Sequence, residues 1–359
     1  MCPSSYPTEG VHSAMSDTPW WHTPPPRPDT ALAARARRRL DTLIKPPGSL
    51  GRLEALAATL AAQQGRPEPQ VERVHISVFA ADHGVCAEAI SSVPQAVTAG
   101  MVRRFSAGDA AIAVLARQLG AGLEVINLGT LEPLPALPAV VDARLARGTA
   151  NMRTGPAMDR ETVAAALEEG RRAFRRAGDC DLFIGGEMGI GNTTAAAALG
   201  GALLGLGSEL AGPGTGLDAA GVERKRAVID QALHRHGPHL ASPLEALRRV
   251  GGLEIAGLTG AFIAAAQARS PVLVDGFIAT VAALTAVRLN PGVRDWLHFG
   301  HHSAEPGHTR LLQTLAAEGL LDLGMRLGEG TGAAAAVPLL RMACALYREM
   351  ATFQEAGFT

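Results

Sequence analysis

The chain has 359 residues, of which 47% are hydrophobic and 19% charged, and its formal net charge at pH 7 is −1. A single hydrophobic core stops growing near about 250–300 residues, so this length predicts one large domain with a smaller annex. The near-neutral charge and the aromatic content of 4% exclude a broad basic field or a base-stacking surface, so we expect no nucleic-acid partner.

The cysteines and the apolar runs indicate the cellular compartment of the protein. Cys2, Cys86, Cys180 and Cys344 are scattered and form no CxxC pair, which favours a reducing compartment. The N-terminus shows no apolar segment typical of a secretory signal. The most apolar run, residues 272–287, contains a charged aspartate and is too short to span a bilayer. These features predict a cytoplasmic protein without a membrane partner.

The first 70 residues predict a tail followed by two helices. Residues 1–28 hold seven prolines, a composition typical of extended or disordered chain, so we expect a tail outside the fold. Residues 29–43 are rich in alanine and arginine and predict a helix. The sequence KPPGSLGR (residues 45–52) ends it, and a second helix is expected at residues 53–63. We assign residues 29–70 to a small helical domain.

The middle of the chain alternates between strands and helices. We expect strands at residues 74–80, 123–128, 181–184 and 271–274, and helices at residues 107–119, 160–176, 193–206 and 221–236. This alternation predicts a doubly wound, mostly parallel α/β sheet of the Rossmann-like kind, here assigned to residues 71–325. A last helix is expected at about residues 332–353. We assign residues 326–359, which contain it, to the small helical domain as well.

The glycine-rich segment at residues 185–194, GGEMGIGNTT, follows an expected strand and precedes a helix of small residues. Glycines let the backbone approach an anion closely, and the start of a helix offers free N–H groups and positive dipole. Helix capping by Thr193 is the simpler explanation, but one cap does not need four glycines together with Glu187 and Asn192. We therefore favour a turn that binds a phosphate.

Three further segments could carry chemistry. In residues 212–218, GPGTGLD, glycines could form a second anion site that Lys225 reaches, or a flexible connector beside a solvated lysine. Residues 301–308, HHSAEPGH, suggest a metal, but Pro306 and Gly307 break the helix that an HExxH zinc site needs, so Ser303 holding a phosphate is favoured. No metal is expected.

Two acidic segments have open interpretations. Glu329 lies between glycines in LGEGTG, where burial could make it a general base and a helix start could equally explain it. Asp82-His83-Gly84 could be an acid–base dyad. Without a serine or cysteine partner we favour an oriented structural histidine there.

These segments together resemble one family, the nicotinate-nucleotide–dimethylbenzimidazole phosphoribosyltransferases of cobalamin biosynthesis. The stretches that carry the resemblance are KPPGSLGRLE (45–54), ADHGV (81–85), PQAVT (94–98), GEMGIGNTT (186–194), GTGLD (214–218), DGFI (275–278), SAEPGH (303–308) and LDLGMRLGEGTGAA (321–334). They cover the chain from about residue 30 onward. His301 and His302, directly before SAEPGH, are the one visible departure.

The resemblance implies transfer of phosphoribose from nicotinate mononucleotide to 5,6-dimethylbenzimidazole, without a cofactor, in a homodimer. It implies that Glu329 is the base and Glu187 a second carboxylate near the reacting carbon. The phosphate is then expected on the backbone of Gly189, Ile190, Gly191 and Asn192, with Lys225 and Ser303 assisting. The benzimidazole pocket is expected to include Ser92 and Gln95.

Two other functions are compatible with parts of the sequence. A Rossmann-type oxidoreductase using NAD would need a complete GxGxxG fingerprint, which the chain does not have. A nucleotide-binding protein without catalysis would need the phosphate turns but no base.

Overall fold

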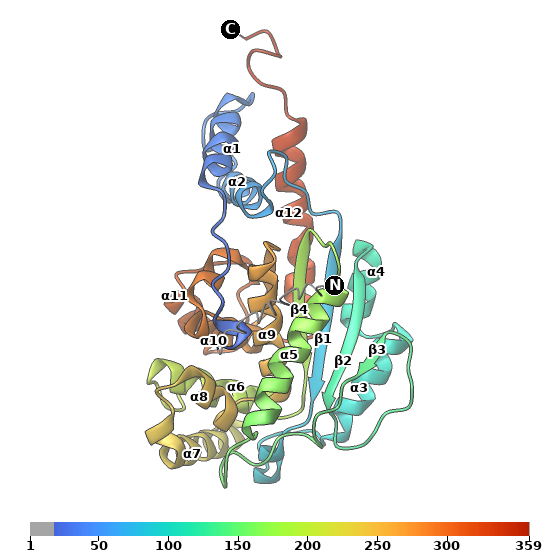
Figure 1. The fold of residues 1–359 in the computed structure, drawn as a ribbon, viewed down its shortest axis with the longest axis vertical. Coiled ribbons are helices and arrows are strands. Elements are labelled where there is room, and N and C mark those ends of the chain that lie inside the picture. Colours follow the sequence, from blue (N-terminus) through green and yellow to red (C-terminus); the bar gives the residue numbers. More distant parts are fainter. Residues whose placement is uncertain (1–17, 359) are drawn as a thin grey trace, which may run out of the picture.

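The computed structural model describes residues 18–358 and confirms the expected fold class: an α/β fold around one sheet, with a smaller helical annex (Figure 1). Its strands are β1 (Val74–Ala81), β2 (Gly122–Gly129), β3 (Val140–Asp142), β4 (Leu182–Met188), β5 (Val272–Val274), β6 (Leu297–His301) and β7 (Gly319–Leu321). Its helices are α1 (Thr30–Thr42), α2 (Arg52–Gln64), α3 (Ala96–Ala107), α4 (Ala111–Leu119), α5 (Arg160–Arg176), α6 (Asn192–Leu204), α7 (Ala219–His236), α8 (Pro243–Val250), α9 (Leu253–Gln267), α10 (Phe277–Leu289), α11 (His308–Thr314) and α12 (Thr331–Glu349), and its 3-10 turns are η1 (Trp20–His22), η2 (Gly84–Glu88), η3 (Gly237–His239) and η4 (Pro291–Trp296).

All paired strands of the sheet run parallel, in the order β3-β2-β1-β4-β5-β6-β7. The chain order reverses between β1 and β4. In open parallel sheets the ligand lies at this switch point, outside the carboxyl ends of the strands. The topology therefore points to the segments that follow Ala81 and Met188.

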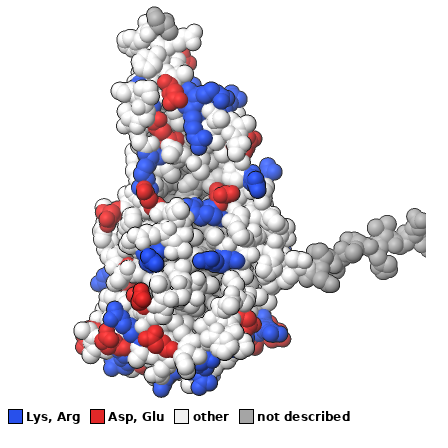
Figure 2. Space-filling model, turned by 90° about the vertical axis from the view of Figure 1, so that its left-hand side faces the viewer, with Lys and Arg blue, Asp and Glu red and all other residues white. Residues whose placement is uncertain are grey.

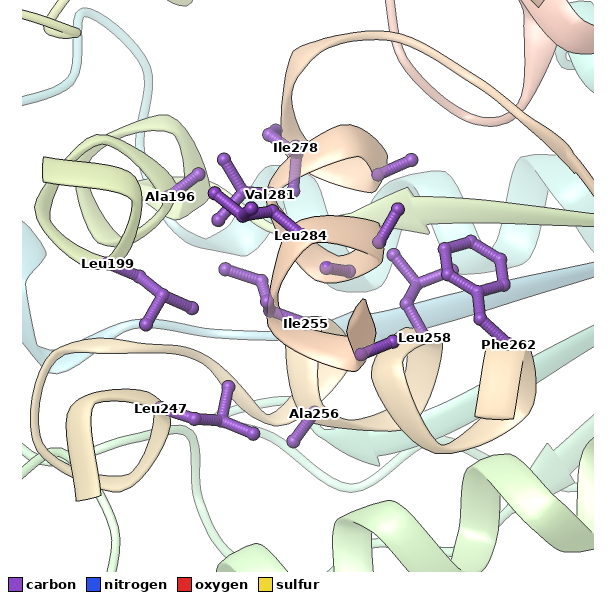
Figure 3. Close-up of a cluster of buried hydrophobic side chains, with 14 of the residues drawn as sticks. Ala196, Leu199, Leu247, Ile255, Ala256, Leu258, Phe262, Ile278, Val281 and Leu284 are labelled. Carbon is purple, nitrogen blue, oxygen red and sulfur yellow. The ribbon is translucent and has the colours of Figure 1, made fainter. Parts of the chain in front are cut away.

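The main core lies between the sheet and the helices α6, α8, α9 and α10. Figure 3 shows aliphatic side chains of these helices interlocking, with Leu258 and Phe262 of α9 pointing toward the sheet. Nearly every residue of α9 and α10 is buried, which explains why neither helix shows a polar face in the sequence. These two helices hold the inner strands in place.

The annex consists of α1, α2 and the far end of α12, which extends beyond the sheet and packs beside α2 (Figure 1). Its small core contains Leu40, Leu43, Leu56 and Tyr347. The near end of α12 packs on the sheet through residues such as Val337 and Leu340. One helix thus belongs to both cores, and the division of the chain at residues 70 and 325 stays a prediction.

The proline-rich segment corrects one expectation. Residues 18–28 are part of the fold and not a free tail, whereas residues 1–17 lie outside the described residues. The Trp296 indole N–H donates to the carbonyl of Pro26 at 3.1 Å, and the Arg171 guanidinium lies 4.8 Å from the Trp20 ring. Composition indicates extended chain but does not reveal that its carbonyl groups find donors on other elements.

Asn290 and Gln267 each donate two hydrogen bonds to this segment. Asn290 Nδ2 donates to the carbonyls of Trp21 and Thr23, at 3.1 and 2.8 Å, and its side chain is buried. Asn290→Ala should lower the free energy of unfolding by about 1–3 kcal/mol, because the half-buried Trp21 carbonyl loses its donor and the Thr23 carbonyl keeps only Gln267. Urea denaturation measures this. Arg27→Ala, at an exposed position of the same segment, is the control, and an equal effect of both changes would contradict the prediction.

No helix among the described residues is long and apolar enough to cross a membrane. On the face drawn in Figure 2, Lys and Arg gather at the narrow annex end, and over the large domain the two signs of charge are interspersed.

Candidate active site

A cavity of about 340 Å³ opens at the carboxyl ends of β4, β5 and β6. Its polar wall contains Glu187, Asp275, Ser303, Glu305 and Glu329, and its apolar wall contains Met101, Met188, Phe277, Ile278 and Leu327. Segments far apart in sequence therefore meet at the place that the sheet topology indicates. The mixture of carboxylates and apolar side chains suits a ligand that is partly charged and partly aromatic.

The glycine segment is shorter than the sequence suggests. Gly185, Gly186, Glu187 and Met188 belong to β4, paired with β1, so only residues 189–191 form the turn before α6. Gly191 has φ of +96° and caps α6, a conformation that glycine adopts without strain. Of the ten residues expected to form the turn, 185–188 thus belong to β4, 189–191 form the turn and 192–194 begin α6.

The backbone N–H groups of this turn are not equivalent. That of Ile190 donates to Thr98 Oγ1 at 3.1 Å, and that of Asn192 donates to the Gly189 carbonyl at 3.0 Å. Within residues 18–358, no acceptor is found for the N–H groups of Gly191 and Thr193. Of these two residues only Thr193 lines the cavity, so its N–H is the one available to a phosphate at the start of α6. Sequence reasoning did not assign Thr193 to the phosphate.

Lys225 lies behind the wall of the cavity. Its Nζ donates to Thr193 Oγ1 at 2.8 Å and to the Gly212 carbonyl at 3.0 Å, and the side chain is fully buried. Burial lowers the pKa of Lys225 to about 8, while the charge of Glu305 opposes that change. Lys225 thus supplies a positive charge next to Thr193, as expected if residues 212–218 and Lys225 form a second anion site. Its side chain does not line the cavity, so the charge acts from behind Thr193.

Ser303 and Glu305 also line the cavity. The backbone N–H of Ser303 donates to His308 Nδ1 at 2.8 Å, and His308 Nε2 lies 2.9 Å from Thr280 Oγ1. An Nδ1 that accepts fixes His308 in its neutral form with the proton on Nε2, and burial accordingly lowers the pKa of His308 to about 3. This histidine orients the Ser303 segment. Among residues 18–358, no group of His, Cys, Asp and Glu side chains could hold a metal ion.

The Glu329 turn has an unusual backbone. Gly328, Glu329 and Gly330 have φ of +92°, +64° and +89°, so three successive residues are left-handed. For a residue other than glycine this conformation costs about 1–3 kcal/mol and is found mostly at functional sites. The carboxylate of Asp275 holds the turn, since it accepts from the N–H groups of Gly330 and Ala333 at 3.1 and 2.9 Å.

The carboxylates of the cavity are shifted toward their neutral forms. Burial, followed by the charges of Asp275, Glu254 and Glu329, raises the pKa of Glu187 well above its usual range. Burial also raises the pKa of Glu329, with Asp275 adding to the rise and the backbone N–H of Ile112 opposing it. Asn192 Nδ2 donates to Glu187 Oε2 and fixes its orientation. Two carboxyl groups with raised pKa values in one cavity are typical of acid–base chemistry.

Ser92 and Gln95 do not line the cavity. Ser92 is exposed, and its Oγ donates to the Thr215 carbonyl at 2.8 Å, so it reaches the cavity only through Thr215. The Gln95 amide donates to the His83 carbonyl at 2.7 Å. Their expected contact with the benzimidazole stays a prediction.

Besides Thr193, two residues at the cavity were given no role by sequence reasoning. Arg326 lies at the rim, where its Nη1 donates to the Gly214 carbonyl at 3.2 Å. Asp275 holds the Glu329 turn. Both lie in stretches that carry the family resemblance, LDLGMRLGEGTGAA and DGFI, but neither was assigned a role. Each of the two lies far along the chain from the residue that it contacts, so no local sequence pattern indicates its role.

A helix start at the switch point of a parallel sheet, beside buried carboxylates, is typical of open α/β proteins that bind a phosphorylated ligand next to an acidic centre. Comparison with known proteins narrows this class. Residues 25–358 match a family described as phosphoribosyltransferase.

Among curated proteins, the nicotinate-nucleotide–dimethylbenzimidazole phosphoribosyltransferase of Pseudomonas aeruginosa is 61% identical over 341 residues, covering 94% of this chain and 97% of that protein. That of Azotobacter vinelandii is 59% identical over 342 residues, with the same coverage. A crystal structure of the Thermus thermophilus enzyme has a TM-score of 0.88 at 46% identity, covering 92% of this chain and 99% of that one. The chain belongs to the nicotinate-nucleotide–dimethylbenzimidazole phosphoribosyltransferase family.

Proposed function

We propose that this chain transfers phosphoribose from nicotinate mononucleotide to 5,6-dimethylbenzimidazole, releasing nicotinate and forming α-ribazole 5′-phosphate. The observation that carries the proposal is that Thr193, whose N–H at the start of α6 has no acceptor among residues 18–358, lines the same cavity as the buried carboxylates Glu187 and Glu329. The names of its relatives describe the same reaction. They give no support to an NAD-dependent oxidoreductase.

The arrangement suits each stage of this reaction. The phosphate lies at the start of α6, near the charges of Lys225 and Arg326, and this anchors the ribose. Nicotinate leaves as a neutral pyridine ring, so the anomeric carbon develops positive charge. Negative charge at Glu187 stabilises that carbon. Attack on the face opposite the leaving group then converts a β-linkage into an α-linkage.

Glu329 is the proposed proton acceptor. The attacking benzimidazole carries one N–H, and removing that proton makes the other ring nitrogen a better nucleophile. Burial raises the pKa of Glu329, which brings it closer to the value at which a carboxylate accepts a proton most effectively near neutral pH. The apolar wall around Phe277 and Leu327 would receive the aromatic ring.

Product analysis tests this proposal directly. The purified protein is incubated with nicotinate mononucleotide and 5,6-dimethylbenzimidazole, and the products are separated by chromatography. Nicotinate and α-ribazole 5′-phosphate are expected in equal amounts. Binding of the nucleotide without either product would favour a non-catalytic nucleotide-binding protein instead.

The charge of Lys225 should make catalytic efficiency depend on pH. With a pKa of about 8 in the free protein, Lys225 is charged below that pH and loses its charge as the pH rises above it. Since kcat/KM reports groups of the free enzyme, kcat/KM for the nucleotide should fall as pH increases beyond about 8. In Lys225→Met this fall should disappear, with KM increased roughly tenfold.

Arg326→Gln is the matched comparison for that experiment, because the guanidinium stays charged over the whole range. It should increase KM for the nucleotide but keep the fall above pH 8. The dephosphorylated nucleoside should bind the parent and both variants alike. If Lys225→Met still prefers the nucleotide as strongly as the parent does, Lys225 does not contribute to phosphate binding.

The cytoplasmic location, which the scattered cysteines favour, and the homodimer, which the family resemblance implies, are parts of the same proposal. Cell fractionation and the mass in solution, measured by light scattering, test them separately from the activity.

A further inference from the structure

A buried histidine and a buried glutamate lie beneath the phosphate turn, and the proposed reaction does not use them directly. His83 Nε2 is 2.8 Å from Glu254 Oε1, and the two side chains are 1% and 0% exposed. His83 follows β1, and Glu254 is in the first turn of α9. The pair thus joins the strand end at the switch point to a central helix of the core.

The imidazole packs directly against the turn. A Cβ atom added at Gly189 would lie 3.3 Å from His83 Nε2, and one at Gly191 would lie 3.2 Å from the Cβ of His83. On the other side, a Cβ added at Gly252 would approach the imidazole Cε1 to 2.5 Å. The ring has no room to move without moving the backbone that holds the phosphate.

The surroundings of the pair are acidic. Asp82 lies beside it, with an Oδ1 that has no partner among the described residues. Glu187 faces it from β4, with Asp275 and Glu329 beyond. Cys86 of η2 is the remaining titratable neighbour. Among residues 18–358, His83 is the only basic side chain within ion-pair distance of Glu254. An unpaired buried carboxylate is costly, so Glu254 depends on its contact with His83.

Glu254 also acts on the reaction centre. Its charge contributes to the raised pKa of Glu187, after burial and Asp275. Any charge on His83 opposes that effect, because it neutralises Glu254. The state of the pair therefore influences how much negative charge Glu187 carries at a given pH.

We propose that His83 and Glu254 form a buried ion pair that positions the Gly189–Gly191 turn and controls the negative charge available at Glu187. The inference rests on the proposed function, in which Glu187 faces the reacting carbon. Both residues act through others, so they are positioning residues.

Two isosteric variants give opposite results if the pair is charged. His83→Gln leaves the charge of Glu254 uncompensated, so Glu187 ionises at higher pH and the acid limb of the kcat profile moves upward. Glu254→Gln removes a negative neighbour, so the acid limb moves downward. We expect shifts of about half a pH unit or more. Both variants should increase KM for nicotinate mononucleotide, because both loosen the turn.

A purely structural role would give a different pattern, with slower turnover in both variants and no opposite shifts of the acid limb. His298→Gln is the control. His298 is half-buried at the start of β6, away from the cavity, and its Nε2 lies 2.8 Å from Gln63 Oε1. It should change neither the acid limb nor KM. Acid limbs that move in the same direction in His83→Gln and Glu254→Gln would overturn the inference.

A second measurement does not depend on activity. The ¹⁵N signals of His83, assigned by their loss in His83→Gln, should show protons on both ring nitrogens at pH 7. A neutral imidazole would overturn the ion pair even in an active enzyme. Conversely, absence of product with the parent protein would contradict the proposed function, while the ¹⁵N signals would still decide the state of the pair.

Discussion

Glu329→Gln should reduce turnover by roughly 10²–10⁴, the usual contribution of a general base, while nucleotide affinity stays close to that of the parent. Glutamine keeps the size of the side chain and its hydrogen bond from the Ile112 N–H, which lies 3.3 Å from Oε2, but it cannot accept the benzimidazole proton. Steady-state kinetics with both substrates, together with calorimetric binding of nicotinate mononucleotide, separate the two effects.

The backbone supports this assignment. A strained left-handed residue between two left-handed glycines persists only when the surrounding structure enforces it, and here the carboxylate of Asp275 does so. The left-handed backbone at residue 329 therefore places the Glu329 carboxylate at the cavity, and the strain of this backbone lowers the stability of the fold. Glutamine at the same backbone position has the same strain, so the free energy of unfolding should barely change.

Glu124→Gln is the control for this experiment. Glu124 is also a buried carboxylate, but it lies near the start of β2 and pairs with Arg176 at 2.9 Å. Its replacement should affect stability and leave turnover unchanged. The parent enzyme should lose turnover as the pH falls through the raised pKa values of Glu329 and Glu187, because their protonated forms neither accept a proton nor stabilise positive charge. Turnover of Glu329→Gln within threefold of the parent would remove Glu329 from the role of base.

The sequence predicted the strand-to-helix alternation and the two acidic glycine segments because these are local patterns. It placed β1 and α5 well, since continuous apolar runs and amphipathic periodicity extend over their whole lengths. It ended β4 too early, at residue 184, because glycine disfavours strands. The strand continues to Met188 because β1 pairs with it and because α9 fills the space above Gly185.

The missed features depend on contacts between distant parts of the chain. His83 and Glu254 are 171 positions apart, and either residue alone is an ordinary polar residue near the end of an element. Lys225 was expected to reach an anion directly, but its burial behind Thr193 depends on how α7 packs against α6. Such positions follow from the sheet order, which local sequence patterns do not determine.

Gly186→Ala should reduce turnover by about 10² or more, although residue 186 carries no chemical group. A Cβ atom there would lie 2.2 Å from the carbonyl oxygen of Glu329 and 2.5 Å from its carbonyl carbon. Both contacts are with backbone, so no side-chain rotation can relieve them. The Glu329 turn would have to move away from β4 by a large fraction of an ångström, which separates Glu329 from Glu187.

The kinetics and the unfolding curve of Gly186→Ala together identify the cause. Overpacking should lower the free energy of unfolding by about 1–3 kcal/mol, measured by urea denaturation, yet the protein should stay folded at 25 °C and bind the nucleotide. Gly237→Ala is the control, because a Cβ atom at Gly237 meets nothing within 4 Å, and it should change neither quantity appreciably. If Gly186→Ala keeps full turnover, the contact between β4 and the turn is not needed, and the two carboxylates can do their chemistry from more than one relative position. A folded protein with normal nucleotide affinity and lost turnover would mean instead that catalysis depends on holding Glu187 and Glu329 at a fixed separation, which only glycine at position 186 allows.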